Sequence, residues 1–250
     1  MSDGIKRRDV LTGAALALVG SAAARAGIIQ GELPWRPDEV SPPSPVEPGP
    51  WQFFTPQELP VIEALADRII PPDPETPGGK DAGCVVFLDR QLAGPYGSAE
   101  GLYERGPFIP GVEQQGPQSS RTPAQTYRAA LQALDEYCRE GGGGGTSRGK
   151  RFAELAPEEQ DEVMRGLEAG AVHLSGVDAK KFFDTLRKDI QDGFFADPIY
   201  GGNRDMCAWK MIGFPGARYD YRDWVGRHNE RYPLPPVSIA GRADWTPKHR

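Results

Sequence analysis

Side chains that could do redox or metal chemistry are few and scattered. The chain holds three cysteines and three histidines, at Cys84, Cys138, Cys207, His173, His228 and His249. Covalent haem needs a Cys-x-x-Cys-His run, and an iron–sulfur cluster needs about four thiolates. No G-x-G-x-x-G turn for a dinucleotide and no H-E-x-x-H zinc helix occurs either. We therefore expect no catalytic residue, no cofactor-binding residue and no metal site in this chain.

One glycine-rich segment imitates a phosphate-binding loop. Gly144 to Lys150 satisfies G-x-x-x-x-G-K, but Arg151 follows where a serine or threonine would hold Mg²⁺. No hydrophobic strand precedes the run of glycines from Gly141 to Gly145. The segment is interpreted as a flexible surface insertion.

Aromatic side chains concentrate near the C-terminus. Between Phe194 and Trp224, eight of 31 residues are aromatic, against 9 % of the whole chain. Such residues on ordered loops can close a hydrophobic core, and they are also enriched at buried protein interfaces. Both interpretations stay open from the residue pattern alone.

The elements that carry these residues follow a helical pattern. Apolar residues recur at helical spacing over 55–70, 85–92, 122–138, 157–169 and 178–194, and a short helix is expected after Asn203. Thr55, Thr122 and Asp178 are predicted N-caps. No stretch alternates as a strand does. The sequence predicts an all-α fold, a compact helical domain of about five to six helices with long irregular loops, over residues 51–250.

The N-terminus has the layout of an export signal. Arg7 and Arg8 precede a weakly apolar run, and Ala24 and Ala26 form a small-x-small cleavage site. The run is shorter than the ~20 residues needed to span a bilayer. Residues 1–26 are therefore predicted to be a twin-arginine signal peptide and the protein to be periplasmic, although an uncleaved signal could act as an anchor.

Charge and proline content describe the rest of the mature chain. Seven prolines in the seventeen residues 34–50 predict that residues 27–50 form an extended linker or arm. Removal of residues 1–26 leaves 25 basic and 33 acidic groups, a net charge of −8. Nucleic acids and anionic lipid surfaces select basic faces, so neither is expected as a partner.

Two segments of the chain carry a family resemblance. The first is Phe53–Glu58 (FFTPQE) running into Ala64–Pro71 (ALADRIIP). The second is Gly193–Asn203 (GFFADPIYGGN) followed by Trp209–Gly216 (WKMIGFPG). Together with the twin-arginine signal, they resemble the gluconate 2-dehydrogenase subunit 3 family over roughly residues 53–221.

This resemblance implies a role without chemistry of its own. Members are small subunits of membrane-bound sugar and polyol dehydrogenases. In these complexes, a GMC-type subunit binds FAD and oxidises the substrate, and a multihaem cytochrome c subunit passes electrons to the quinone pool. The resemblance therefore implies that FAD and haem c belong to the partners, and that this subunit supports maturation and export of the flavoprotein.

The aromatic segment is the expected contact with the flavoprotein. The predicted interface residues are Phe194, Phe195, Tyr200, Asn203, Trp209 and Phe214, with Trp209 and Phe214 as anchors. Cys207 lies within the same segment, so an intersubunit disulfide there is a hypothesis. Paired thiols elsewhere and isolated reduced thiols are the other options for the three cysteines.

Two alternatives to the accessory subunit remain at this level. The first is a stand-alone exported enzyme or sugar-binding protein with an aromatic-lined pocket, in which Asp197, Asn203 and Asp205 supply polar contacts. The second is a dedicated maturation chaperone that leaves the enzyme after export.

Overall fold

The computed structural model describes residues 44–46, 49–100, 106–109, 111–112, 119–142, 148–218 and 221–241. The predicted signal, with Arg7, Arg8, Ala24 and Ala26, and most of the predicted arm lie outside these residues. The described part contains six α-helices: α2 (Leu59–Ile69), α3 (Cys84–Ala93), α4 (Pro123–Arg139), α5 (Pro157–Glu168), α6 (Ala179–Phe195) and α7 (Cys207–Ile212). Short 3-10 turns are η2 (Phe152–Glu154), η3 (Pro198–Tyr200), η4 (Arg204–Met206) and η5 (Arg222–Trp224). These residues form no strand, only two isolated bridges. The all-α prediction is confirmed.

Helix starts follow the predicted capping chemistry. The Thr122 side chain accepts a hydrogen bond from the Gln125 backbone N–H, and the Gln125 side chain accepts one from the Thr122 N–H. Asp178 caps α6 by accepting from the Lys181 N–H. Each cap satisfies backbone donors that have no partner inside the helix.

The first helix begins later than its cap pattern predicts. Thr55 and Glu58 exchange the expected reciprocal hydrogen bonds, at 2.9 and 3.3 Å. Regular α-helix starts only at Leu59, after a turn over residues 56–58. Pro60 is then the second helical residue, where its missing N–H costs no helical hydrogen bond.

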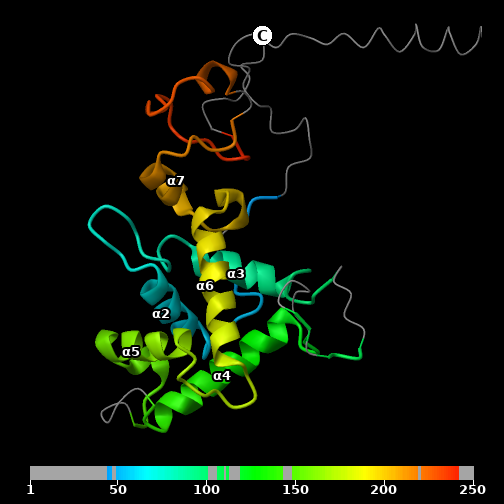
Figure 1. Cartoon of the computed structure of the whole chain (residues 1–250). Coiled ribbons are helices and arrows are strands. Elements are labelled where there is room, and N and C mark those ends of the chain that lie inside the picture. Colours follow the sequence, from blue (N-terminus) through cyan, green and yellow to red (C-terminus); the bar gives the residue numbers. More distant parts are fainter. Residues whose placement is uncertain are drawn as a thin grey trace, which may run out of the picture. The chain divides into compact units, whose positions relative to one another are not determined.

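Helix α6 lies at the centre of the fold. It contacts each of the other five helices, and Figure 1 shows it running from α4 and α5 past α2 and α3 to α7. Its buried positions recur at helical spacing and include a carboxylate: Phe182, Phe183, Leu186, Asp189, Ile190, Gly193 and Phe194. Burial of each large apolar side chain stabilises the fold by about 1.5–3 kcal/mol.

The buried carboxylate of α6 is satisfied by two tyrosines. Asp189 Oδ2 accepts from the Tyr127 hydroxyl of α4 at 2.7 Å and from the Tyr96 hydroxyl at 2.9 Å. Burial raises the pKa of the Asp189 carboxyl, while the two tyrosine hydrogen bonds act to lower that pKa. The polar contact fixes α6 against α4 inside an otherwise apolar core.

A second buried carboxylate anchors the segment that precedes α2. Asp89 of α3 accepts hydrogen bonds from the backbone N–H groups of Gln52, Phe53 and Phe54, each at 2.9 Å. It also forms an ion pair with Arg90. One side chain therefore fixes Gln52 and the first two residues of the Phe53–Glu58 segment against α3.

The described residues include no helix that is long and apolar enough to cross a membrane.

Replacement of Asp89 by alanine should destabilise the fold by about 2–4 kcal/mol. The physical reason is that three backbone donors lose their common acceptor, and Arg90 loses its partner. Urea unfolding of the mature chain would measure the change. Asp161→Ala is the matched control, because its ion pair with Arg68 is partly exposed and such pairs contribute less than about 1 kcal/mol. Equal effects of the two changes would contradict the anchoring role of Asp89.

Candidate functional site

The second signature segment folds back on the end of α6. After Phe195 the chain turns through η3, passes Asn203, and enters α7 by way of η4. The Arg204 N–H donates to Ala82 O at 2.9 Å, which ties the segment to the residues before α3. The segment therefore contacts both the end of α6 and the residues just before α3.

The close fit of this segment depends on glycine. A Cβ on Gly202 would lie 2.0 Å from Gly193 O, and a Cβ on Gly83 would lie 2.5 Å from Gly201 O. Both distances are far below van der Waals contact. Only glycine allows the backbone at residue 83, the end of α6 at residue 193 and the loop at residues 201–202 to come this close together.

Asn203 is a structural residue of the loop. It is fully buried, with its Nδ2 donating to Ala196 O and its Oδ1 accepting from the Ala208 N–H, both at 2.9 Å. Asn203, Asp205 and Met206 all have left-handed backbone conformations, with φ of 45°, 55° and 57°. Such conformations cost about 1 kcal/mol or more each and persist only when neighbouring contacts hold them.

Trp209 connects α7 to the end of α6. Its indole Nε1 donates to Phe195 O at 2.9 Å, and its ring packs edge-to-face on Phe214 with centroids 5.2 Å apart. Phe194 packs in the same way on Phe195. Phe194 and Trp209 are themselves buried, with 3 % and 6 % of their surface exposed.

The predicted interface residues therefore divide into two groups. Phe194, Asn203 and Trp209 are buried inside this chain and support the segment from within. Phe195, Tyr200 and Phe214 are exposed by 42 %, 37 % and 44 %. Of the six predicted interface residues, only Phe195, Tyr200 and Phe214 therefore remain candidates for direct contact with a partner.

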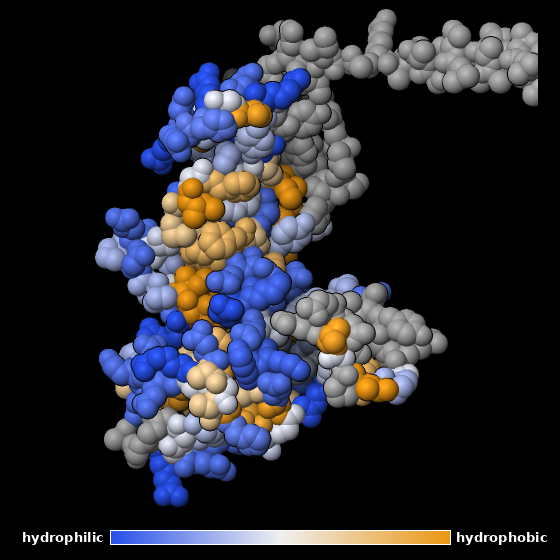
Figure 2. Space-filling view, in the orientation of Figure 1, coloured by the Kyte–Doolittle hydropathy of each residue, from blue (hydrophilic) through white to orange (hydrophobic). Residues whose placement is uncertain are grey.

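Two further exposed residues join this group. Met211 and Ile212 of α7 are exposed by 51 % and 57 %. Helix α7 ends at Ile212, and Gly213, in the left-handed conformation, turns the chain away. We call the exposed residues around Trp209, namely Phe195, Met211, Ile212 and Phe214, the α7 surface. Hydrophobic side chains gather over α7 and the adjacent end of α6 in Figure 2.

Both ends of the described chain are tied to this segment, and Asp197 holds the C-terminal one. Its Oδ1 accepts from the Ser238 hydroxyl at 2.6 Å, and its Oδ2 accepts from the Ile239 N–H at 2.8 Å. The Val46 N–H, from the arm, donates to Ile199 O at 2.8 Å. Residues 217–241, here called the C-terminal tail, also pair with the segment through a bridge between Gly216 and Val237.

The three cysteines do not pair with one another. Cys84 and Cys138 are buried free thiols, and Cys207 is a half-buried one. Burial raises the pKa of Cys84 and of Cys138 to about 12, and burial likewise raises the pKa of Cys207. Raised values reduce the thiolate fraction that disulfide exchange requires. The intersubunit disulfide at Cys207 stays a prediction.

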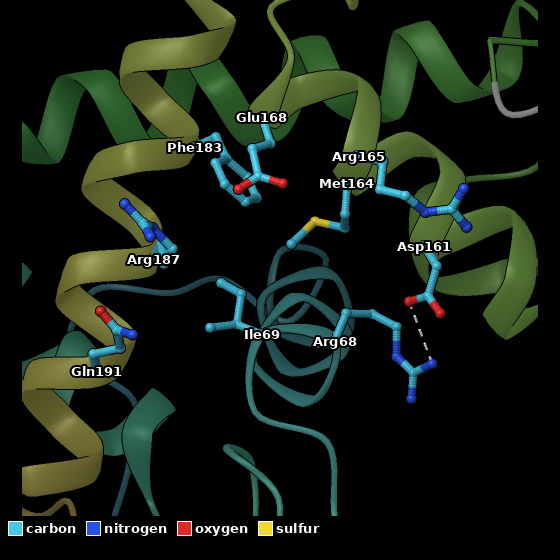
Figure 3. A pocket seen from close by; sticks show the side chains of 9 residues that line it. All are labelled: Arg68, Ile69, Asp161, Met164, Arg165, Glu168, Phe183, Arg187 and Gln191. Atoms are coloured by element: carbon cyan, nitrogen blue, oxygen red, sulfur yellow. Dashed lines mark ion pairs between the residues drawn. The ribbon is translucent and has the colours of Figure 1, made fainter.

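A separate cavity lies where α2, α5 and α6 meet. It measures about 360 Å³ and is lined by Arg68, Ile69, Asp161, Met164, Arg165, Glu168, Phe183, Arg187 and Gln191. Figure 3 shows Ile69, Met164 and Phe183 at its floor, with charged groups of both signs around the rim. Arg68 is paired with Asp161 at 3.5 Å. The mixed rim presents no convergent set of catalytic groups, and within the described ranges no cluster of His, Cys, Asp and Glu could hold a metal ion.

Replacement of Asp197 by alanine should loosen the tail. Hydrogen bonds to a charged acceptor contribute about 1.5–3 kcal/mol each, so the Ile239 amide should exchange roughly 10- to 100-fold faster. Hydrogen exchange followed by NMR would measure this rate. Glu230→Ala, also in the tail, is the control, because its contact with Arg227 at 3.9 Å is long. Unchanged protection of Ile239 in the Asp197 variant would show that the bridge at Val237 holds the tail without the carboxylate.

A protein-family model matches the sequence of this chain. The model of the family described as gluconate 2-dehydrogenase subunit 3 matches residues 56–216. No curated protein and no solved structure matches the chain. The matched range starts just before α2 and ends just beyond Phe214, so it contains all six helices and the α7 surface. The C-terminal tail lies outside it.

Proposed function

The chain belongs to the gluconate 2-dehydrogenase subunit 3 family, and on this premise we propose that it is a non-catalytic accessory subunit of a periplasmic dehydrogenase complex. The family is that of one subunit of such a complex, so the partners of this chain are other dehydrogenase subunits. The family resemblance suggests which subunits these are. We propose that the partners are an FAD-containing GMC-type catalytic subunit, which holds the FAD, and a multihaem cytochrome c subunit, which holds the haem c.

The observation that carries this proposal is the α7 surface. Four apolar side chains from 42 % to 57 % exposed come from residues 195–214, within the family-matched range, and Figure 2 shows hydrophobic surface gathered over α7 and the adjacent end of α6. Contiguous exposed apolar surface on a soluble protein marks an interaction site. Tyr200, at the end of η3, adds a fifth exposed aromatic or apolar side chain from the same segment. We assign the α7 surface as the contact with the FAD subunit.

The buried polar residues of the segment do not support the sugar-binding alternative. That alternative uses Asp197, Asn203 and Asp205 as polar contacts to a sugar. Asp205 is exposed. Asp197 and Asn203 are buried and already bonded to Ser238, Ile239, Ala196 and Ala208 of the same chain. A ligand would have to break these contacts first.

Replacement of Ile212 by aspartate should weaken the complex. Placing a charge at the centre of an apolar contact should cost about 2 kcal/mol or more, roughly a 30-fold rise in Kd. Pull-down of the tagged mature chain from periplasm, with immunodetection of the FAD subunit, would measure recovery. Ile109→Asp is the matched control, because Ile109 is 64 % exposed but belongs to the loop between α3 and α4.

Circular dichroism should show that both variants keep their helices, since both positions are exposed. Recovery of a clean monomer from the wild-type chain, with no flavoprotein, would overturn the accessory-subunit proposal. If the Ile212 and Ile109 variants recovered equal amounts of the FAD subunit, the α7 surface would not be the contact, although the accessory-subunit proposal would stand.

Replacement of both Arg7 and Arg8 by lysine should leave the FAD subunit in the cytoplasm. We propose that this chain and the FAD subunit are exported together on the signal of this chain. The physical reason is that the flavoprotein must acquire FAD in the cytoplasm and therefore crosses the membrane already folded. Fractionation followed by a dye-linked activity assay of periplasm and cytoplasm would locate the enzyme. Exchange of Lys6 for arginine is the control and should not alter the location. Continued periplasmic activity of the double variant would refute the shared signal.

A further inference from the structure

Charge is distributed unequally along this chain. Residues 1–200 contain 20 basic and 30 acidic groups, a net charge of −10, whereas residues 201–250 contain nine basic and five acidic groups, a net charge of +4. The sign therefore reverses at the segment that bears the α7 surface. None of the described basic residues after residue 200 is buried, so the positive charge lies at the surface and outside the hydrophobic core.

Basic side chains occur on α7 and along the tail that follows it. In the described part of residues 204–241, six basic groups face three acidic ones; the basic groups are Arg204, Lys210, Arg218, Arg222, Arg227 and Arg231. Lys210 and Arg204 are exposed, and neither is paired with a carboxylate among the described residues. Lys210 precedes Met211 and Ile212 directly, so a positive charge adjoins the apolar side chains.

Aromatic rings hold part of this charge in place. The Arg218 guanidinium lies 5.1 Å from the centre of the Tyr232 ring, and that of Arg227 lies 4.6 Å from the Trp224 ring. Trp224 and Tyr232 in turn pack edge-to-face with centroids 5.0 Å apart. A cation–π contact orders a guanidinium. Arg227 is also paired with Glu230 at 3.9 Å. The Tyr221 hydroxyl donates to Gly216 O, which joins this cluster to the chain two residues after Phe214.

Resting on the function proposed above, we infer that the partner's socket for the α7 surface is apolar at its centre and rimmed by carboxylates. The apolar side chains enter the socket, and the basic groups of α7 and the tail pair with its rim. Fully desolvated apolar contacts set the lifetime of such a complex, whereas rim charges chiefly raise the association rate and fix the orientation.

A protein surface fits these features better than an anionic membrane does. Helix α7 has only six residues, too few for the long amphipathic face of a membrane-surface helix, and the exposed Phe214 packs on the buried Trp209 beside it. The first 200 residues would also be repelled by anionic lipid, since their net charge is −10. An acidic rim on a protein can be confined to the contact with α7 and the tail, whereas an anionic membrane surface continues beside that contact and repels the acidic residues.

The test measures association rates against salt. The full mature chain would bind immobilised, purified FAD subunit at 50, 150 and 500 mM NaCl. In the double variant Lys210→Glu, Arg231→Glu, we expect an association rate about tenfold lower at 50 mM than in the wild type, with a nearly unchanged dissociation rate. The difference should shrink at 500 mM, where charges are screened within about 4 Å.

The matched control is Arg148→Glu, Lys150→Glu, which makes the same change of charge in the loop before η2. Binding that is equally fast in both double variants would overturn the acidic rim while leaving the accessory function intact. Absence of binding by the wild-type chain would overturn the proposed function and, with it, this inference. Salt-sensitive binding of the wild-type chain to phosphatidylglycerol vesicles, lost in the Lys210/Arg231 variant, would assign the surface to a membrane instead.

Discussion

Five helices pack on one, and the rest of the molecule follows from that arrangement. Helix α6 reaches its neighbours through phenylalanine, leucine and isoleucine side chains that are almost completely buried. Such burial leaves little freedom at its C-terminal end, where the second signature segment begins. Asp189, buried midway along the helix, adds a directional contact through Tyr127, and this contact resists rotation of α6 within the core. The position of the α7 surface is therefore set by the core of the fold.

The helices were largely predictable because their signals are local. Thr122, Asp178 and the apolar spacing of each helix involve residues within one or two turns, and the structure uses them as predicted. The late start of α2 marks the limit of this reasoning. A reciprocal Thr55–Glu58 contact forms equally well in a turn, so the pattern locates a chain reversal more reliably than the first helical residue.

The site was only half predictable, because its residues are sorted by long-range contacts. Aromatic and polar residue types pointed to residues 194–214 as a candidate interface, but they did not predict which of these side chains would be buried. Asn203 is buried because its amide bridges Ala196 and Ala208 across a left-handed turn. The exposure of Ile212 follows from the end of α7 at Gly213, a signal that is present in the sequence. By contrast, nothing near Asp197 in sequence indicates that its carboxylate binds residues 238 and 239.

That last contact bears on how the tail relates to the family. Asp197 lies inside the family-matched range, whereas Ser238 and Ile239 lie beyond it. Asp197 Oδ1 also accepts from the Ile199 N–H at 3.0 Å, which forms the turn into η3, so the carboxylate has a role even without the tail. A tail that donates a hydroxyl and one N–H can then dock on a preformed acceptor, and the core need not change. The tail carries arginines and begins directly after the α7 surface. Docking of the tail on Asp197 therefore adds positive charge beside the apolar contact and leaves the helical core unchanged. The tail can thus add its charge beside the α7 surface while the fold and the apolar contact stay the same.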